Sequence, residues 1–400
     1  MVAISEPPSA LKGQSMPHPA RWVAVDALRG VVMALMALDH VRDYFTGAHF
    51  SPTDLAHTTA ALFFTRWVTH FCAPVFFLLA GLGAFLSLSR GKTHSTLAFY
   101  LVTRGLWLIV LEMTVVSFAW TFNFTPTVYE LGVIWALGCS MVMQGGLVYL
   151  PRPLIAAFAV LLIVGHNLFD ALRAEDLKAW GPLWAILHTG EDIALTSTLT
   201  IDPFYPLVPW VGVMALGYAL GPMLEKGAPG PRRLLLGAGM MLTAAFVLLR
   251  VANGYGDPAP WSAQPSAILT VLSFLNTTKY PPSLPYLLMT LGPALMAFAL
   301  FVDKTGGAVA RFFIVFGQAP LFFYLVHLYV IHGLALGAGY LSGYDLRAFL
   351  ALFVSFPQDY GFSLPVVYWI WIGVVVTLYP LCRWYGAIKA SRHHQALAYL

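Results

Sequence analysis

Long apolar stretches recur along the whole chain, and each is about as long as a helix needs to be to cross a bilayer. About 20 apolar residues in a helix span the hydrocarbon core. The pattern predicts about ten membrane-spanning helices, near 22–45, 61–89, 95–119, 130–150, 153–170, 206–224, 233–252, 284–302, 309–337 and 364–386. The predicted fold class is therefore all-α, a polytopic integral membrane protein.

The apolar segments follow one another without a polar stretch long enough for a second folding unit. We therefore expect a single transmembrane domain over residues 21–390. Residues 1–20 hold four prolines and no apolar core of signal-peptide length, so they are predicted to form a disordered cytoplasmic tail. Residues 391–400 are predicted to form a second cytoplasmic tail.

Basic residues orient the predicted helices, because Lys and Arg gather in cytoplasmic loops. The connections at 46–60 and 120–130 contain neither, and 171–205 holds two basic residues against five acids. The alternate connections and the two termini, which would lie on the other side of the membrane, hold thirteen basic residues: Lys12, Arg21, Arg90, Lys92, Arg152, Lys226, Arg232, Arg233, Lys304, Arg311, Arg383, Lys389 and Arg392. This distribution predicts an even number of spans with both termini in the cytoplasm.

Composition supports the membrane assignment and excludes several functions. The chain is 59% hydrophobic and 10% charged, whereas soluble domains carry roughly a quarter charged residues. A formal net charge of +4 gives no reason to expect a nucleic-acid partner. The three cysteines show no metal-ligand spacing, and neither a Walker loop nor an HExxH motif occurs. We expect no metal site and no tightly bound cofactor.

The first predicted helix carries ionisable residues that a passive anchor would not keep: Asp26, Arg29, Asp39, His40, Arg42 and Asp43. Such groups cost several kcal/mol each at the centre of a bilayer unless they face a wet or paired interior. The helix is therefore predicted to contribute to a reaction or transport site. With the orientation above, Asp26 and Arg29 lie in its inner half, and Asp39 and His40 lie near its outer end.

Several other polar side chains fall in the outer half of the membrane. Histidine exchanges protons near neutral pH, so it can activate a hydroxyl or amine, or carry an acyl group itself. Asp39 or Asp43 could orient the ring of His40, although neighbouring residues of a helix point about 100° apart and its partner could come from another helix. The remaining candidates on this side are Arg66, His70, His166, Lys279, His327 and His332.

Taken singly, some of these residues also fit a structural role. Arg66, Lys279 and His332 lie at helix ends, where long polar side chains commonly anchor a helix at the interface. Arg104 and Glu112 are two helical turns apart and fit a structural pair as well as a functional one. His70 precedes Pro74 by one turn, and carbonyls freed at a proline kink often line a cavity.

Four segments together resemble the transmembrane acyltransferase superfamily, in the bacterial branch similar to the heparan-alpha-glucosaminide N-acetyltransferase catalytic domain. They are Val25-Asp-Ala-Leu-Arg-Gly30 with Asp39-His40, Phe64-Thr-Arg-Trp-Val-Thr-His-Phe-Cys-Ala-Pro74, Phe274-Leu-Asn-Thr-Thr-Lys-Tyr-Pro-Pro-Ser283 and Phe316-Gly-Gln-Ala-Pro-Leu-Phe-Phe-Tyr-Leu-Val-His327. The resemblance implies transfer of an acetyl (acyl) group from cytoplasmic acetyl-CoA, as co-substrate, to a sugar or glycan acceptor across the bilayer. It also implies residence in a bacterial inner membrane.

The resemblance also suggests roles for residues. Arg29 and His40 have the spacing of the arginine and catalytic histidine in sugar O-acyltransferases of membrane acyltransferase family 3. On this reading, Arg29 and Asp26 serve the donor side, His40 is general base or acyl carrier, and Asp39 is its electrostatic partner. His70 is a further catalytic candidate, and the acceptor side holds Arg66, Lys279, His327 and His332.

Alternatives stay open at this point. In the lysosomal enzyme of this family the active histidine lies in the loop after the first helix, where the nearest residues here are His49 and His57. The chain could instead be a transporter or flippase of a polar lipid or sugar. Proton-coupled transport would need paired carboxylates at mid-depth, and Glu112 is the one convincing candidate outside the first helix. The sequence also leaves open whether the protein forms a homodimer.

Overall fold

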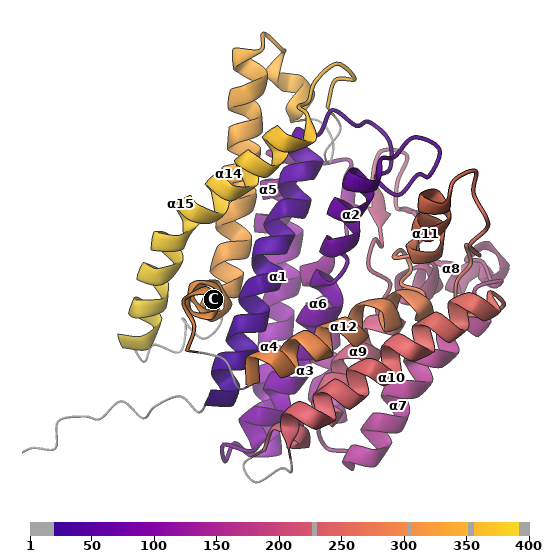
Figure 1. Cartoon of the computed structure of the whole chain (residues 1–400), viewed down its shortest axis with the longest axis vertical. Helices are drawn as coiled ribbons and strands as arrows, with labels where there is room; N and C mark the ends of the chain where they lie inside the picture. The colour runs from indigo at the N-terminus through magenta and orange to yellow at the C-terminus, as the bar shows by residue number, and fades with distance from the viewer. Residues whose placement is uncertain (1–19, 226–229, 303–305, 351–355, 392–400) are drawn as a thin grey trace, which may run out of the picture.

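The computed structural model describes residues 20–225, 230–302, 306–350 and 356–391, which are mostly helical (Figure 1). The predicted tails, 1–20 and 391–400, lie outside these ranges except for Ala20 and Ser391, which belong to helices. In the first half of the chain the α-helices are α1 (Ala20–Phe45), α2 (Ala60–Thr69), α3 (Cys72–Leu88), α4 (His94–Leu111), α5 (Ser117–Thr121), α6 (Val133–Leu147), α7 (Arg152–Gly165) and α8 (Gly181–Trp184).

The second half continues the helical pattern, and short 3-10 and π-helical turns join several elements. The α-helices are α9 (Leu207–Ala219), α10 (Pro231–Ala252), α11 (Ala267–Leu275), α12 (Leu284–Val302), α13 (Ala308–Gln318), α14 (Pro320–Leu341) and α15 (Leu364–Ser391). The turns are η1 (Glu112–Val116), η2 (His166–Phe169), η3 (Glu175–Trp180), η4 (Ala185–Thr189), η5 (Gly221–Leu224) and η6 (Leu346–Phe349).

Seven of the described helical segments are long and apolar enough to cross a membrane, and each overlaps a predicted span: Ala60–Leu88, His94–Thr121, Arg152–Phe169, Pro231–Ala252, Leu284–Val302, Pro320–Leu341 and Leu364–Ser391. Helices α6, α9 and α13 are apolar but shorter. Helix α1 has 26 residues and the charges noted above. The membrane-protein assignment is confirmed, while ten spans stays a prediction.

Helix α1 runs through the middle of the bundle and contacts α2, α3 and α12 on one side and α13, α14 and α15 on the other (Figure 1). Its crossing with α13 is very close. An ideal Cβ atom on Gly30 would lie 1.8 Å from the Phe313 carbonyl oxygen, and one on Gly317 would lie 1.9 Å from the Asp26 carbonyl oxygen. Glycine at both positions lets the two backbones touch, as small residues commonly do in membrane bundles.

The predicted span at 309–337 is wrong as a single helix. The structure has two helices, α13 and α14, which meet at Ala319, where φ is −128° and ψ is 48°. Pro320 opens α14, and proline disfavours helical geometry in the residue before it. A new helix, α14, therefore begins at Pro320. His327 belongs to this helix and not to a continuation of α13.

The span predicted at 61–89 is also interrupted, at His70 and Phe71, between α2 and α3. Pro74 lies in the first turn of α3 and cannot donate a backbone hydrogen bond back across the break. The carbonyl of His70 accepts a hydrogen bond from the Tyr286 hydroxyl of α12 at 2.8 Å. This bond satisfies a backbone group that the break would otherwise leave unpaired.

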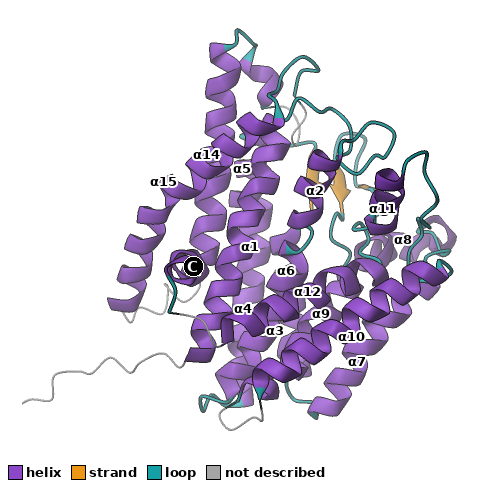
Figure 2. Ribbon diagram, in the orientation of Figure 1, coloured by secondary structure: helices purple, strands orange, loops and turns teal. Residues whose placement is uncertain are grey.

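A small sheet, which the apolar pattern did not predict, lies among the connections at one end of the bundle (Figure 2). Its strands are β1 (Val128–Glu130), β2 (Ile193–Ala194) and β3 (Thr200–Asp202), in the order β1-β3-β2. Strands β1 and β3 are parallel and place Glu130 opposite Asp202. The sheet thus joins the α5–α6 connection to the long connection before α9.

Candidate active site

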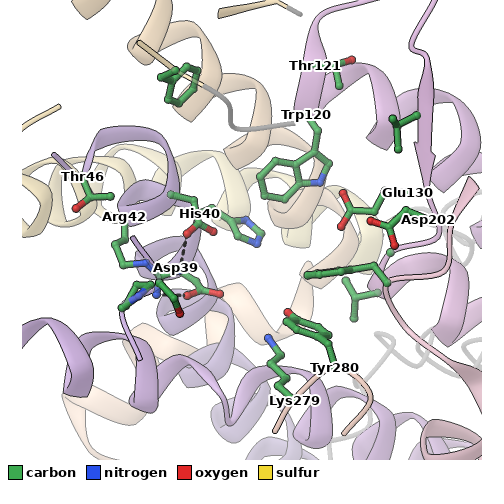
Figure 3. Close-up of a pocket in the computed structure, with 18 of the residues that line it drawn as sticks. Asp39, His40, Arg42, Thr46, Trp120, Thr121, Glu130, Asp202, Lys279 and Tyr280 are labelled. Carbon is green, nitrogen blue, oxygen red and sulfur yellow. Dashed lines mark hydrogen bonds and ion pairs between the residues drawn. The ribbon is translucent and has the colours of Figure 1, made fainter. Parts of the chain in front are cut away.

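A cavity of about 810 Å³ opens at the C-terminal end of α1 (Figure 3). Its walls come from α1, α2, η1, α5, the strands β1 and β3, the connection between α11 and α12, and α14. Charged or titratable side chains from nearly all of these elements line it: Asp39, His40, Arg42, Asp43, His49, Arg66, Glu112, Glu130, Tyr205, Asp202, Lys279, Tyr280 and Tyr324. Such polarity in a membrane bundle indicates a functional site.

His40 lies on the cavity wall and contacts a second histidine behind it. Its Nδ1 atom is 2.7 Å from Nε2 of His327, which is fully buried in α14. The two rings are nearly parallel, with centroids 4.9 Å apart. Trp120 meets the His40 ring edge-on at 4.7 Å and limits how it can turn (Figure 3).

The contacts of His327 determine which nitrogen of His40 is free. Nδ1 of His327 lies 2.9 Å from the Phe323 carbonyl oxygen. A carbonyl only accepts, so this nitrogen carries a hydrogen, and in the neutral ring Nε2 is then the acceptor. His40 must donate to it through Nδ1–H, which leaves Nε2 of His40 unprotonated. That nitrogen can take a proton or attack an electrophile.

Asp39, next to His40 in sequence, serves other partners. Its carboxylate accepts hydrogen bonds from Nη1 of Arg66 at 2.5 Å and from the Thr69 hydroxyl at 2.7 Å, and it lies 2.7 Å from Nη1 of Arg42. Arg42 also pairs with Asp43. Asp39 therefore links α1 to α2 and holds two guanidinium groups beside the cavity, while His327 takes the place of an acid behind the His40 ring.

Lys279 reaches the cavity from the connection between α11 and α12 (Figure 3). Two charged side chains, Arg250 and Asp257, hold this connection in place through hydrogen bonds. Arg250 of α10 donates to the carbonyls of Phe274, Ser273 and Asn276, and Asp257 accepts from the backbone and hydroxyl of Thr278. The Lys279 ammonium lies 4.8 Å from the centre of the Tyr280 ring, a cation–π contact.

Two carboxyl groups, Glu130 and Asp202, face the cavity from neighbouring strands, on the other side of Trp120 from the arginines (Figure 3). Burial raises the pKa of Glu130 well above its ordinary value, and the nearby carboxylates of Glu112 and Asp202 raise it further. Burial also raises the pKa of Asp202. This wall can thus hold protons and donate hydrogen bonds at pH values where a free carboxylate only accepts them.

The other predicted catalytic and acceptor-side residues lie outside the cavity wall. His70 is buried at the α2–α3 break and does not line the cavity. His332 is buried, with its ring nitrogens 2.9 and 3.1 Å from the carbonyls of Ala119 and Phe349, and its ring stacks on Phe122. His327 is buried behind His40, which it contacts, and it does not line the cavity.

The predicted donor-side residues lie at the opposite end of α1. Nη1 of Arg29 donates to Asp26 and to the Gly317 carbonyl, both at 3.1 Å. His40 is eleven positions further along the helix than Arg29, which corresponds to about 16 Å along the axis. The structure therefore brings together His40, Asp39, Arg66 and Lys279 and leaves Asp26 and Arg29 apart from them.

The two loop histidines differ from each other. His49 lies on the cavity wall, with Nε2 2.9 Å from the Tyr360 carbonyl oxygen. His57 is exposed and pairs with Asp54 at 2.6 Å, which lowers the pKa of that carboxyl. Among the histidines that line the cavity, His40 is the one supported by a second histidine.

Sequence reasoning missed Trp120, Glu130, Asp202 and Tyr280. Trp120 and Tyr280 resemble ordinary interfacial aromatics, and acids are common in outer loops. A usable signal was that Glu130 is the first residue of the apolar span predicted at 130–150, where a carboxyl needs a reason to stay.

Comparison with known families settles the lineage. The family described as heparan-alpha-glucosaminide N-acetyltransferase, catalytic, matches residues 21–248, more than half of the chain. The chain belongs to this family. Membership gives it a membrane acetyltransferase type of function and confirms the resemblance read from the sequence. No curated protein matched the chain. The match covers His40 and Glu130, whereas Lys279 and His327 lie beyond it.

Proposed function

We propose that the protein transfers an acetyl or other short acyl group from cytoplasmic acyl-CoA to a sugar or glycan on the outer side of a bacterial inner membrane. The observation that carries the proposal is the pair formed by His40, on the wall of the polar cavity, and His327, buried behind it. Its hydrogen bonds leave Nε2 of His40 as a base facing the cavity. The acetyltransferase family supplies the reaction class.

In the direct reaction, Nε2 of His40 accepts the proton of an acceptor hydroxyl or amine as that group attacks the thioester carbonyl. A carbon–oxygen or carbon–nitrogen bond forms, the carbon–sulfur bond breaks, and the thiolate of CoA leaves. His40 then returns its proton to the thiolate. In the two-step alternative, Nε2 attacks the thioester carbonyl, the carbon–sulfur bond breaks and the thiolate of CoA leaves. The acceptor then attacks the acyl carbon, the acyl–nitrogen bond breaks, and Nε2 takes the acceptor's proton, which passes to the thiolate. Both routes need the same free nitrogen.

The donor side follows from the charges along α1. Arg29 lies near the end of the helix that the basic loops assign to the cytoplasm, where a nucleotide phosphate would need a cation. We assign Arg29 to the donor and keep Asp26 as the residue that orients its guanidinium. Acyl-CoA is a co-substrate in this scheme, and no resident cofactor is required.

The first experiment supplies membranes carrying the protein with acetyl-CoA labelled in the acetyl group. We expect label in a glycan fraction, and loss of it in His40→Ala at unchanged protein level. Label that is equal in His40→Ala and the wild type would overturn the assignment. Label retained on the protein without acceptor, and dependent on His40, would select the two-step route.

The role of His327 needs variants that separate hydrogen bonding from shape. His327→Gln keeps a carbonyl oxygen that can accept from Nδ1 of His40, whereas His327→Phe keeps bulk without an acceptor. We expect kcat to fall by about 10²-fold or more in His327→Phe and by less in His327→Gln, with KM nearly unchanged, because a general base contributes about that much. Equal loss in the two variants would argue for packing alone.

Binding of CoA separates the enzyme from a transporter. Purified protein should be stabilised against heat by CoA, and Arg29→Leu should weaken that shift. A flippase has no reason to recognise the nucleotide, so the absence of any shift in the wild type would favour that alternative.

A further inference from the structure

Lys279 carries a buried ammonium group that makes no salt bridge among the described residues; the carboxylate of Asp39, which pairs with Arg42 and Arg66, acts on it only at longer range. It exposes only 9% of its surface, and its contacts are the faces of Tyr280 and Tyr205. An ammonium removed from water is costly unless a counter-charge compensates it. Cation–π contacts supply only part of this compensation. The side chain lines the cavity beside His40, so its counter-charge can come from what binds there (Figure 3).

The carboxylates on the same side of the cavity are already engaged. Asp39 bonds Arg66, Arg42 and Thr69, and Asp43 bonds Arg42. The cations Arg42, Arg66 and Lys279 therefore exceed the anions Asp39 and Asp43 by one. Arg66 donates to Asp39 through Nη1 only, so the remainder of its guanidinium is available to the cavity that it lines.

Resting on the proposed function, we propose that the acceptor carries an anionic group, a phosphate, carboxylate or sulfate, which binds between Lys279 and Arg66. Arginine and lysine are the residues that recognise such groups. The uncharged part of the acceptor then extends toward Glu130 and Asp202, which bind its hydroxyl groups across the cavity. A volume of about 810 Å³ has room for a sugar with an attached anion, well beyond an inorganic ion alone.

The position along α1 favours the acceptor over the donor. Lys279 lies with His40 at the C-terminal end of α1, whereas Arg29, the cation assigned to the donor, is about 16 Å away along the helix. An anion beside His40 also fixes the neighbouring hydroxyl or amine close to Nε2. Lys279 is thus a specificity residue, which selects charged acceptors and places them.

The anion could belong to a lipid-linked sugar phosphate or to a water-soluble sugar acid, and binding experiments separate the two. Purified protein in neutral nanodiscs is heated with glucuronate, glucose 6-phosphate or glucose 6-sulfate, with methyl glucoside as the uncharged probe. In parallel, nanodiscs of phosphatidylglycerol replace those of phosphatidylcholine. Stabilisation by a charged sugar indicates a soluble acceptor, and stabilisation by phosphatidylglycerol alone indicates a lipid-linked one.

Variants of Lys279 test whether the stabilisation by anionic probes depends on the cavity. We expect Lys279→Met to lose the anion-dependent stabilisation and Lys279→Arg to keep most of it. Lys92→Met is the matched control, because Lys92 makes the same kind of contact, 4.7 Å from the Tyr100 ring, on an exposed surface outside the cavity. In transfer assays, Lys279→Met should raise KM for a charged acceptor by about 10- to 100-fold, and by far more than it changes KM for a neutral one.

The outcomes distinguish this inference from the proposed function. His40→Ala should lose acetyl transfer and still be stabilised by the anionic probe, which supports the anion site separately from the chemistry. Probes that stabilise Lys279→Met as much as the wild type would overturn the inference, as would an unchanged KM for charged acceptors. In either case His40-dependent transfer would still stand.

Discussion

Glu130 shows how strongly the pKa of one carboxyl group depends on its surroundings. It lies in a three-residue strand, faces the cavity, and has Asp202 beside it in the sheet. Burial and neighbouring carboxylates raise its pKa well above 4.5. The folded protein therefore keeps a proton on Glu130 at pH values where the unfolded chain has released it.

This difference predicts a pH-dependent stability. From about pH 4.5 upward, the unfolded state loses the proton before the folded state does, so the free energy of unfolding falls as pH rises through this window. Each unit of difference between the folded and unfolded pKa lowers the free energy of unfolding by about 1.4 kcal/mol once both states have released the proton. Glu130→Gln removes that cost. We expect its melting temperature to exceed that of the wild type at pH 8 and by less at pH 5.

The control for this measurement is Glu175→Gln, since Glu175 is exposed in the connection between α7 and α8. Its melting temperature should track the wild type at both pH values. A difference for Glu130→Gln that stays constant between pH 5 and pH 8 would contradict the account.

At the residue scale the sequence predicted part of the site. His40, Asp39, Arg66 and Lys279 were predicted because ionisable side chains in apolar segments need a reason to be there, and all four line one cavity. The contact of His40 with His327 joins residues 287 positions apart. No local pattern carries that information, because it depends on how α1 and α14 pack.

At the scale of elements, the crossing of α1 and α13 controls where α1 lies. Gly30 and Gly317 bring the two backbones into contact near Asp26 and Phe313. The same segment positions the Gly317 carbonyl that Arg29 binds. The crossing therefore fixes how Arg29, on the proposed donor side, lies against α13, and it holds in place the same helix, α1, that carries His40.

We predict that Gly30→Ala destabilises the protein by about 1–3 kcal/mol, the usual cost of overpacking a close contact. An added Cβ would lie 1.8 Å from a backbone oxygen, so α1 or α13 must move. Gly83→Ala is the control, because nothing lies within 4 Å of a Cβ there. Thermal unfolding in detergent should show a clear loss for the first variant only, and equal melting temperatures would contradict the packing argument.

Apolar runs located the long helices well, because a bilayer imposes a minimum length on them. Apolar runs did not reveal where one helix ends and the next begins inside a single apolar stretch. The breaks at His70–Phe71 and at Ala319 occur within continuous apolar sequence, and the nearby prolines, Pro74 and Pro320, are equally compatible with a kink in one continuous helix. The three-stranded sheet was invisible for another reason, since strands of two or three residues have no periodicity to detect.

At the scale of the whole molecule, the distribution of basic residues predicts the orientation. Thr196 lies in the acid-rich connection before α9, and Lys92 lies in the basic connection before α4; both are exposed. The positive-inside rule assigns Thr196 to the outer side and Lys92 to the cytoplasm.

Single cysteines test this in intact cells. A membrane-impermeant maleimide should label Thr196→Cys directly and Lys92→Cys only after the membrane is permeabilised. The three native cysteines are replaced by alanine beforehand, and each variant is checked for retained expression. The reverse pattern would invert the orientation and, with it, the sides assigned to donor and acceptor.

The small sheet has a consequence for how this family could diversify. Strands β1 and β3 join two connections that are distant in sequence, and together they form the wall opposite His40. The histidine pair belongs to α1 and α14, which are held by close helix packing. Exchanges in the sheet can therefore accumulate without disturbing Nε2 of His40, the nitrogen proposed to react. A lineage could acquire new acceptors by altering a few loop residues while its chemistry stays constant.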